Sequence, residues 1–178
     1  MIDIQLKRSY YNSMKTALNI NSYKKDGFKK VCEVSVDDDN HWIYVNINKD
    51  IMFSEHRSWV YAIVEENEIV KIGETGNPLG IACKYHDQPQ IGTKCRLGRY
   101  KRLGGTDEYV RNELNETIQQ GNRVSIWALE CDMVFKDIRV QGKLSTTIIT
   151  YHKDLELRYL DHIYAQTGSI PRLNKARK

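Results

Sequence analysis

The chain has 178 residues, a formal net charge of +4, 40% hydrophobic residues and 28% charged residues. A domain holds roughly 150 residues, so this length predicts one domain with a short appendage and excludes a large multidomain enzyme. With only 3 prolines and 11 glycines, collagen-like and low-complexity sequences are excluded as well. The sequence lacks both a run of about 20 apolar residues and the layout of a signal peptide, so we expect a cytoplasmic protein with no membrane association.

Residues 1–55 are predicted to form an N-terminal extension made of a helix and a hairpin. The helix is expected from about Lys7 to Ile20, where apolar residues recur at steps of three and four. The hairpin strands are expected at Phe28 to Val36 and His41 to Ile47, which are rich in β-branched and aromatic residues. The turn-like segment from Asp37 to Asn40 separates them.

Residues 56–178 are predicted to form the main domain, in which strands and helices are mixed. It begins with a hairpin, because the apolar runs Trp59 to Val64 and Ile69 to Ile72 flank the polar tetrapeptide from Glu65 to Glu68. An arginine-rich helical stretch follows after a loop. Later elements are the helices Asp107 to Gln119 and His152 to Gln166 and the strands Val124 to Leu129 and Val134 to Val140. This order predicts an α+β fold with a small central antiparallel or mixed β-sheet flanked by helices.

Basic residues are concentrated in three stretches. These are residues 7–30, the tail from Arg172, and the nine residues from Lys94 to Arg102, of which five are Lys or Arg and none is acidic. Such clustering indicates a polyanionic partner such as double-stranded DNA, although a single charge run is more often a solvated surface. In the densest stretch the candidate DNA contacts are Lys94, Arg99, Lys101 and Arg102.

Two pairs of residues carry candidate chemistry. Tyr61 and Lys71 lie on the two strands of the main-domain hairpin, so a phenol and an amine share one site; the alternative is a core aromatic residue and an exposed lysine. Arg96 and Tyr100 are four positions apart, which places them on one face of a helix. Because an arginine binds two phosphate oxygens at once, that face suits a scissile phosphodiester. Arg99 is the competing arginine.

Glu156 is predicted to fall within the apolar stripe of the helix from His152 to Gln166. Its neighbours on this arc are Leu155, Tyr159, Leu160, Ile163 and Tyr164. A carboxylate in an apolar stripe is costly to desolvate unless it meets a cation, a metal ion or a hydrogen-bond donor. A structural salt bridge is one interpretation. A single hard cation such as Mg²⁺, which takes one carboxylate, water and a phosphate oxygen, is the other.

Taken in order, these elements resemble the GIY-YIG nuclease superfamily over Ser58 to Asn174. The residues that carry the resemblance are Trp59-Val60-Tyr61, Lys71-Ile72-Gly73, Arg96 to Tyr100, Glu156 on a helix, and Pro171 to Asn174. A tryptophan replaces the first glycine of the superfamily pattern, and a lysine replaces the tyrosine of the second motif. That lysine is similar to the short type II restriction endonucleases of the superfamily. Beyond this core, the chain carries insertions at 76–94 and 132–150.

The resemblance implies a role for each matching residue. Tyr61 would activate or position the attacking water, with Lys71 nearby to lower the pKa of the phenol or to contact the phosphate. Arg96 would hold the scissile phosphate. Glu156 would bind one divalent ion, Mg²⁺ with Mn²⁺ as a substitute. The remaining matching residues would support the phosphate network and orient the site: Tyr100 and Asn174.

The expected function is therefore a sequence-specific double-stranded DNA endonuclease, similar to type II restriction enzymes and encoded by a bacterium or a phage. A homodimer is expected, because one active site per chain must serve two DNA strands. The segments expected to contact DNA or the partner subunit are Met1 to Ser54, Gly76 to Lys94 and Asp132 to Thr150. The alternatives are a phage or mobile-element nuclease of low specificity, a catalytically silent DNA-binding module, and an α/β interaction protein.

Overall fold

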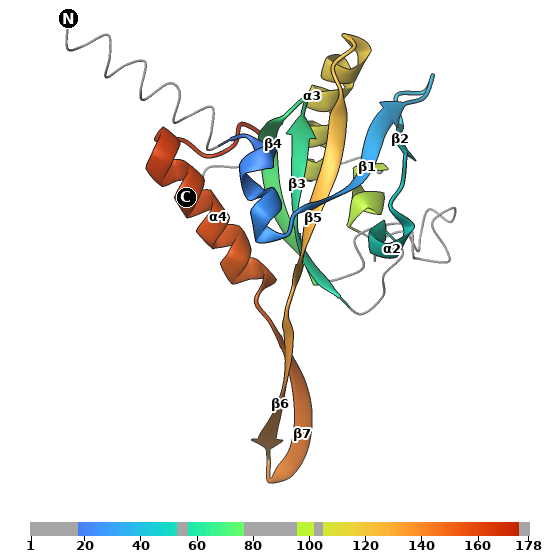
Figure 1. Cartoon of the computed structure of the whole chain (residues 1–178). Coiled ribbons are helices and arrows are strands. Elements are labelled where there is room, and N and C mark those ends of the chain that lie inside the picture. Colours follow the sequence, from blue (N-terminus) through green and yellow to red (C-terminus); the bar gives the residue numbers. More distant parts are fainter. Residues whose placement is uncertain (1–17, 53–56, 77–95, 102–104, 175–178) are drawn as a thin grey trace, which may run out of the picture.

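The computed structural model describes residues 18–52, 57–76, 96–101 and 105–174 (Figure 1). These residues form the α+β fold that the sequence predicts: five strands build one antiparallel sheet with helices on both faces, and two more strands form a separate hairpin. In chain order the elements are η1 (Ile20–Asp26), β1 (Lys29–Val36), β2 (Trp42–Val45), α2 (Lys49–Met52), β3 (Ser58–Glu65), β4 (Glu68–Thr75), η2 (Leu97–Lys101), α3 (Gly105–Gln119), β5 (Val124–Cys131), β6 (Met133–Val140), β7 (Lys143–Thr150) and α4 (His152–Thr167).

The central sheet has the strand order β2-β1-β5-β3-β4, and each neighbouring pair is antiparallel. β3 lies between β5 and β4, and all of its residues except Glu65 are buried. Its sequence is a nearly continuous apolar run, which is what a strand covered on both faces requires. β4 is the last strand of the sheet on its side, so the edge beyond β4 is not paired with a further strand among the described elements.

The helices divide the core into two halves, one on each face of the sheet (Figure 1). α3 and η2 cover one face, where Leu97, Val110 and Leu114 join a cluster that includes Tyr61. α4 and η1 cover the other face, where Leu160 joins a second cluster that includes Val60. Neighbouring residues of β3 therefore point into different cores, as the pleat of a strand dictates.

The N-terminal hairpin predicted from Phe28 to Ile47 is confirmed as β1 and β2. Because β1 also pairs with β5, from Lys29 opposite Ala128 to Val34 opposite Val124, this hairpin is the outer part of the central sheet. The helix predicted from Lys7 lies outside the described residues until Leu18, and Ile20 already begins η1. The division of the chain into 1–55 and 56–178 remains a prediction.

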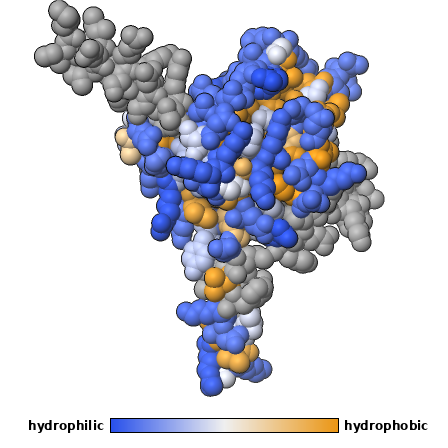
Figure 2. Space-filling view, viewed as in Figure 1, coloured by the Kyte–Doolittle hydropathy of each residue, from blue (hydrophilic) through white to orange (hydrophobic). Residues whose placement is uncertain are grey.

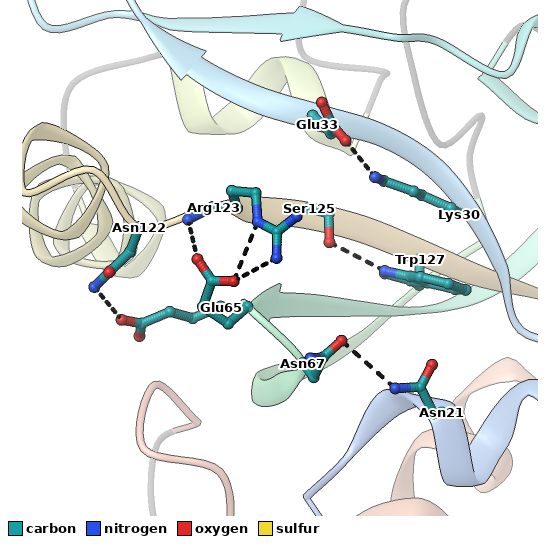
Figure 3. Close-up of polar contacts among 10 residues, drawn as sticks. Asn21, Lys30, Glu33, Glu65, Asn67, Asn122, Arg123, Ser125 and Trp127 are labelled. Atoms are coloured by element: carbon teal, nitrogen blue, oxygen red, sulfur yellow. Dashed lines mark hydrogen bonds and ion pairs between the residues drawn. The ribbon is translucent and has the colours of Figure 1, made fainter.

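The β3–β4 hairpin turns at Glu66, which has a φ of 54° and is held by Arg123. Figure 3 shows Arg123 at this turn, together with Asn122 and Glu65. The Glu66 carboxylate accepts hydrogen bonds from the backbone N and from Nη2 of Arg123, both at 2.8 Å. Asn122 Nδ2 donates to Glu65 at 3.2 Å, and Arg172 Nη2 donates to the same carboxylate at 2.6 Å. We call the ion pairs of Glu65, Glu66, Arg123 and Arg172 the turn end of the hairpin.

The two long helices agree with their predicted ranges to within two residues. α4 ends where Gly168, at a φ of 71°, donates its N–H to the Tyr164 carbonyl. Leu160 and Ile163 are buried, as the apolar stripe predicts, but Tyr164 is 58% exposed and lies outside the buried part of that stripe. Among the described residues, no helix is long and apolar enough to cross a membrane.

β6 and β7 form a hairpin that projects away from the rest of the molecule (Figure 1). The strand predicted from Val134 to Val140 is confirmed as part of β6, whereas β7 was not predicted. The two strands pair along their whole length, and Thr146 Oγ1 donates to Asp137 at 2.7 Å. Exposed apolar residues, with Leu144 at 68%, are interleaved with hydrophilic ones along it (Figure 2).

Candidate active site

Tyr61 lies in the middle of β3 and is completely buried, with its ring crossing over the neighbouring strand at Gly73. A Cβ atom at position 73 would lie 2.4 Å from both Cζ and Oη of Tyr61. Because any side chain larger than hydrogen would occupy the space of the phenol, glycine is the residue that allows this orientation. The glycine of the second motif is therefore required by the tyrosine of the first motif, because only glycine leaves room for the phenol ring of Tyr61.

The phenol of Tyr61 meets Arg96 and Tyr100, as the sequence predicts. Arg96 Nε donates a hydrogen bond to Tyr61 Oη at 2.7 Å, and Tyr61 Oη lies 2.9 Å from Tyr100 Oη. The guanidinium also lies near both rings, with Cζ at 5.4 Å from the Tyr61 centroid and 5.6 Å from that of Tyr100. Arg96 precedes η2, a 3₁₀ helix, so the predicted convergence holds although the local helix is not an α-helix.

Burial sets the protonation states of this network. Desolvation raises the pKa of Tyr61 above its ordinary value, against the opposing influence of Arg96, and raises the pKa of Tyr100 well above it. Desolvation alone would lower the pKa of Arg96, but Tyr61, Tyr100 and Asp107 raise it above its ordinary value. At neutral pH both phenols are therefore protonated and the guanidinium is charged.

Two elements outside the predicted motifs hold this network in place. Trp42 of β2 stacks on Tyr100, with ring centroids 5.0 Å apart and planes at 26°, and Tyr44 Oη donates to the Leu97 carbonyl at 2.7 Å. Asp107, in the first turn of α3, accepts from Arg96 Nη2 at 3.3 Å. The orientation of the guanidinium is thus fixed from two sides.

A pocket of about 310 Å³ lies at the edge of β4 beside this network. Residues from both faces of the sheet reach it around the open strand edge. Lys71 and Arg96 come from the α3 face, and Glu74, His152 and Glu156 come from the α4 face. We call this the β4-edge pocket; its charged or titratable lining residues are Lys71, Glu74, Arg96, Arg99, His152, Lys153 and Glu156.

The remaining predicted site residues support β4. Lys71 is 7% exposed, lines the pocket, and donates from Nζ to the Leu173 carbonyl at 3.4 Å. The Asn174 side chain does not line the β4-edge pocket. Instead it accepts from the Ile72 backbone N at 2.9 Å and donates to the Ile72 carbonyl at 2.7 Å, in the manner of an additional strand. By holding the backbone of Ile72, Asn174 therefore positions β4. Lys71 and Gly73, the neighbours of Ile72 in the chain, are positioned with it.

Glu156 faces the pocket from α4 and is partly buried. Within the described residues, no group of three or more His, Cys, Asp or Glu side chains is arranged to hold a metal ion. The carboxylate of Glu156 is a donor of the kind that fits Mg²⁺, which binds through one or two carboxylates and completes its shell with water and phosphate oxygens.

The candidate DNA contacts are only partly described. Arg99 is exposed and lines the β4-edge pocket beside Arg96. Lys101 is the last residue of η2. Lys94 and Arg102 lie outside the described residues, as does the predicted insertion after Gly76.

Several contributors to the site were not predicted. Asp107 could have been suspected, because it is acidic in the first turn of a helix that follows an arginine cluster. The segment Trp42-Ile43-Tyr44-Val45 forms a half-buried strand, with Trp42 and Tyr44 buried. Its sequence did not indicate that these two side chains support the candidate site. Glu74 and His152 are close only in the fold, so no local pattern points to their contact.

A larger cavity of about 590 Å³ lies between the second half of α4 and residues 169–174. Its lining includes Leu160, Tyr164, Ile170 and Pro171, and Arg172 is its one cationic residue. The buried tyrosine and arginine network opens onto the smaller pocket. We therefore place the candidate active site at the β4-edge pocket.

No protein-family model and no curated protein sequence matches this chain. Among solved structures, a mutant of bacteriophage T4 EndoII is similar at a TM-score of 0.50 and 16% sequence identity, over 79% of this chain and 91% of that chain. The restriction endonuclease HPY188I in complex with product DNA aligns at a TM-score of 0.46 and 17% identity, over 90% of this chain and 87% of that chain. The first of these likenesses shows a shared fold.

Proposed function

We propose that this chain is a DNA endonuclease that hydrolyses phosphodiester bonds at the β4-edge pocket with one divalent ion. The observation that carries the proposal is the hydrogen-bonded set of Tyr61, Arg96 and Tyr100 beside a pocket that also contains Lys71 and Glu156. The GIY-YIG resemblance predicts these residues for one site from motifs far apart in sequence. The fold shared with T4 EndoII supports a nuclease.

Arg96 is proposed to hold the scissile phosphate. Its Nε and Nη2 are engaged by Tyr61 and Asp107, so the plane of the guanidinium is preorganised before substrate arrives. Lys71, Arg99 and Lys153 line the same pocket and add positive charge. A phosphodiester entering this pocket meets more cations than carboxylates, which favours binding of an anion.

Tyr61 is proposed to position the attacking water and to accept its proton. Because burial raises the pKa of Tyr61, the phenol is neutral at pH 7. It can therefore take the proton of the water only while it gives its own hydroxyl proton to a phosphate oxygen. Arg96, rather than Lys71, is the cation in direct contact with the phenol oxygen. Hydrolysis then proceeds in one displacement without a covalent enzyme intermediate.

Glu156 is proposed to bind Mg²⁺, with Mn²⁺ as a substitute. The ion would neutralise the charge that develops on the leaving oxygen. Among the other matching residues, Tyr100 supports the phenol of Tyr61, and Asn174 holds β4 in register with the pocket. The cut position depends on how DNA lies across these groups.

The projecting hairpin β6–β7 is proposed to contact the DNA beside the cleavage point. A two-stranded ribbon fits the major groove of B-DNA, and β7 leads directly into α4, whose first residue lines the pocket. Its described cations are Lys136, Arg139 and Lys143, against Asp137 alone, which is bonded to Thr146. Replacing the three cations with alanine is expected to weaken DNA binding and to reduce the salt slope of the affinity by about three.

Restriction-like site specificity and a homodimer are also proposed. A duplex cut in both strands needs two active sites or two binding events, and a twofold dimer provides two sites in one complex. Sedimentation of the full chain with and without duplex DNA tests the dimer, which must bind as two chains per duplex. A single chain per cleaved duplex would contradict it.

The central experiment is digestion of a long duplex DNA of known sequence. We expect discrete fragments with Mg²⁺ or Mn²⁺, none with EDTA, and none from the Glu156→Ala variant. Glu116→Ala, which removes an exposed carboxylate on α3, is the matched control and should cleave normally. Thermal melting of both variants checks that they fold.

Each other outcome identifies a different protein. Metal-dependent degradation to a smear would keep the nuclease but replace restriction with low specificity. Intact DNA that is nevertheless bound in a salt-dependent manner would identify a catalytically silent DNA-binding module. Intact DNA without binding would leave the α/β interaction protein.

A further inference from the structure

We infer that Glu74 and His152 form a positioning pair that sets Glu156 at the β4-edge pocket. The inference rests on the proposed metal role of Glu156. His152 Nε2 lies 3.0 Å from Glu74 Oε2, and the histidine side chain is 10% exposed. Both residues line the same pocket as Glu156, yet neither belongs to the motifs on which the nuclease resemblance depends.

The pair joins the first turn of α4 to the edge strand of the sheet. Glu74 is opposite Val60 in the β3–β4 ladder, so it points to the α4 face, where His152 is the first residue of the helix. Glu156 follows His152 by four residues, which places both on one side of the helix. A hydrogen bond at His152 therefore fixes the rotation of the helix about its axis, and with it the direction of Glu156.

Among the described contacts, the start of this helix lacks both a side-chain cap and a strand of the central sheet leading into it. Its N-cap residue, Tyr151, makes no side-chain capping hydrogen bond. The preceding strand, β7, belongs to the projecting hairpin and pairs with β6 alone. Leu155 packs against the core in the first turn but is only partly buried, and the buried apolar residues Leu160 and Ile163 lie two turns or more beyond the start of the helix. The contact between His152 and Glu74 is thus a polar anchor at the end of the helix that carries Glu156.

Close packing restricts the position of the His152 imidazole ring. A Cβ atom at Gly76 would lie 3.1 Å from His152 Cε1, so the ring packs against the backbone of the chain as it leaves β4. Because Nε2 faces a carboxylate, it carries the proton and donates, while the buried Nδ1 has no hydrogen-bond partner among the described residues. A hydrogen-bond partner that orients a metal-binding carboxylate indirectly is typical of metal sites.

The test compares the charge of Glu74 with its hydrogen bond. Glu74→Gln keeps an oxygen that accepts from His152 Nε2, whereas Glu74→Ala and His152→Ala remove the contact. For the full chain we would measure the Mg²⁺ concentration that gives half-maximal cleavage, kcat and KM for duplex DNA. In parallel, Mn²⁺ binding without DNA would be followed by the electron paramagnetic resonance of the free ion.

For the two alanine variants we expect a rise of about 10-fold or more in the half-saturating metal concentration, and weaker Mn²⁺ binding. Excess metal should restore kcat, with KM for DNA unchanged, and Glu74→Gln should behave like the native chain. The exposed pair of His41 and Asp37, at 3.6 Å on the far edge of the sheet, provides the control: His41→Ala should change neither quantity.

Two results would overturn the inference. Unchanged metal dependence in His152→Ala and Glu74→Ala would show that the pair does not position Glu156. Equal loss in Glu74→Gln and Glu74→Ala would show that Glu74 binds the ion itself. If His152→Ala does not fold, the two Glu74 variants still decide between these cases. Metal binding that survives Glu156→Ala would instead refute the proposed function.

Discussion

The two ends of the β3–β4 hairpin both carry clusters of charged residues. At one end these residues form exposed ion pairs, and at the other they are largely buried beside a pocket. At the turn end, Arg123 pairs with Glu66 and Arg172 pairs with Glu65, and the arginine side chains are 78% and 42% exposed. At the β4-edge pocket, Arg96 has a side chain only 17% exposed and faces a hollow together with Lys71. Exposed pairs neutralise one another at little gain in stability, whereas cations gathered around a hollow call for an anion.

The number of charged residues alone does not distinguish the turn end from the β4-edge pocket. The turn end is the more complete set of ion pairs, and the one cation that lines the cavity beside it, Arg172, is already paired with Glu65. What distinguishes the β4-edge pocket is that Arg96 is held by two neutral phenols, Tyr61 and Tyr100, with Asp107 as its one acidic partner among the described contacts. Burying the Arg96 and Lys71 cations beside one pocket costs free energy, which the binding of an anion would offset.

Removing the central cation should have the largest effect. Arg96→Ala is expected to lower the cleavage rate by about 100- to 1000-fold, because it removes a preorganised donor to the phosphate. Arg96→Lys should restore little, since an ammonium cannot contact Tyr61, Asp107 and a phosphate in one plane. Single-turnover cleavage measures both. Full activity of the Arg96→Ala variant would contradict this role and would assign the phosphate contact to Arg99 instead.

Filling the space above Gly73 should affect both stability and activity. Gly73→Ala places a methyl group against the Tyr61 ring, and overpacking of this kind costs about 1–3 kcal/mol. The rate of cleavage should fall as the phenol is displaced. The double variant Gly73→Ala, Tyr61→Ala removes the clash, so its loss of stability in urea should be smaller than the sum of the two single losses. Additive losses would contradict this geometry.

Alkaline pH should weaken the pocket end before it affects the turn end. Burial raises the pKa of Tyr61 above its ordinary 10.0 and raises that of Tyr44 and Tyr100 further. A group whose folded-state pKa is raised stabilises the fold while it is protonated. That stabilisation is complete below about pH 10 and is lost as the pH rises through the folded-state pKa.

The turn end has the opposite sign. Hydrogen bonds from Arg123 lower the pKa of Glu66 below 4.5, so its smaller contribution is lost as the pH falls. Urea unfolding from about pH 3 to about pH 12 would separate the two limbs, because the loss from Glu66 lies below its ordinary pKa of 4.5 and the loss from Tyr61 lies above its ordinary pKa of 10.0. Tyr61→Phe should make the alkaline limb shallower, because phenylalanine has no proton to lose. An identical limb in that variant would mean that Tyr61 stays protonated throughout.

The smallest effect is expected at the turn end itself. Arg123→Ala removes a fork to Glu66 that is exposed to solvent and screened by salt. Cleavage should be unchanged, and the melting temperature should fall by less than it does in Gly73→Ala. If Arg123→Ala lost as much activity as Arg96→Ala, the proposed difference in function between the turn end and the β4-edge pocket would be wrong.

Periodicity predicted the elements that bury an apolar face. β1, β3, β5, α3 and α4 were found because their residues repeat at the spacing of a strand or a helix. β7 was not predicted, because its apolar residues Leu144, Ile148 and Ile149 do not alternate with polar ones at the spacing of a strand, and its pairing with β6 is what makes it a strand. Local pattern alone does not encode such a partner.

The candidate site was predictable where motif order was available. Tyr61, Arg96 and Tyr100 were expected together and are in contact. Asn174 was expected to orient the site; its side chain binds the backbone of Ile72, a contact that no spacing rule specifies. Glu74 and Trp42 were missed because their partners, His152 and Tyr100, are distant in the sequence, and only the fold defines those neighbours.

The hairpin β6–β7 interrupts the chain between the last strand of the sheet and the helix that carries Glu156. Its base is closed by the pairing of Met133 with Thr150, so the chain leaves the body and returns to it at nearly one point. A relative could lengthen, trim or exchange this segment without moving any strand of the sheet. Under the proposal that β6–β7 contacts DNA, changes in recognition would accumulate in this one segment, while the residues proposed for the reaction lie in a separate part of the chain.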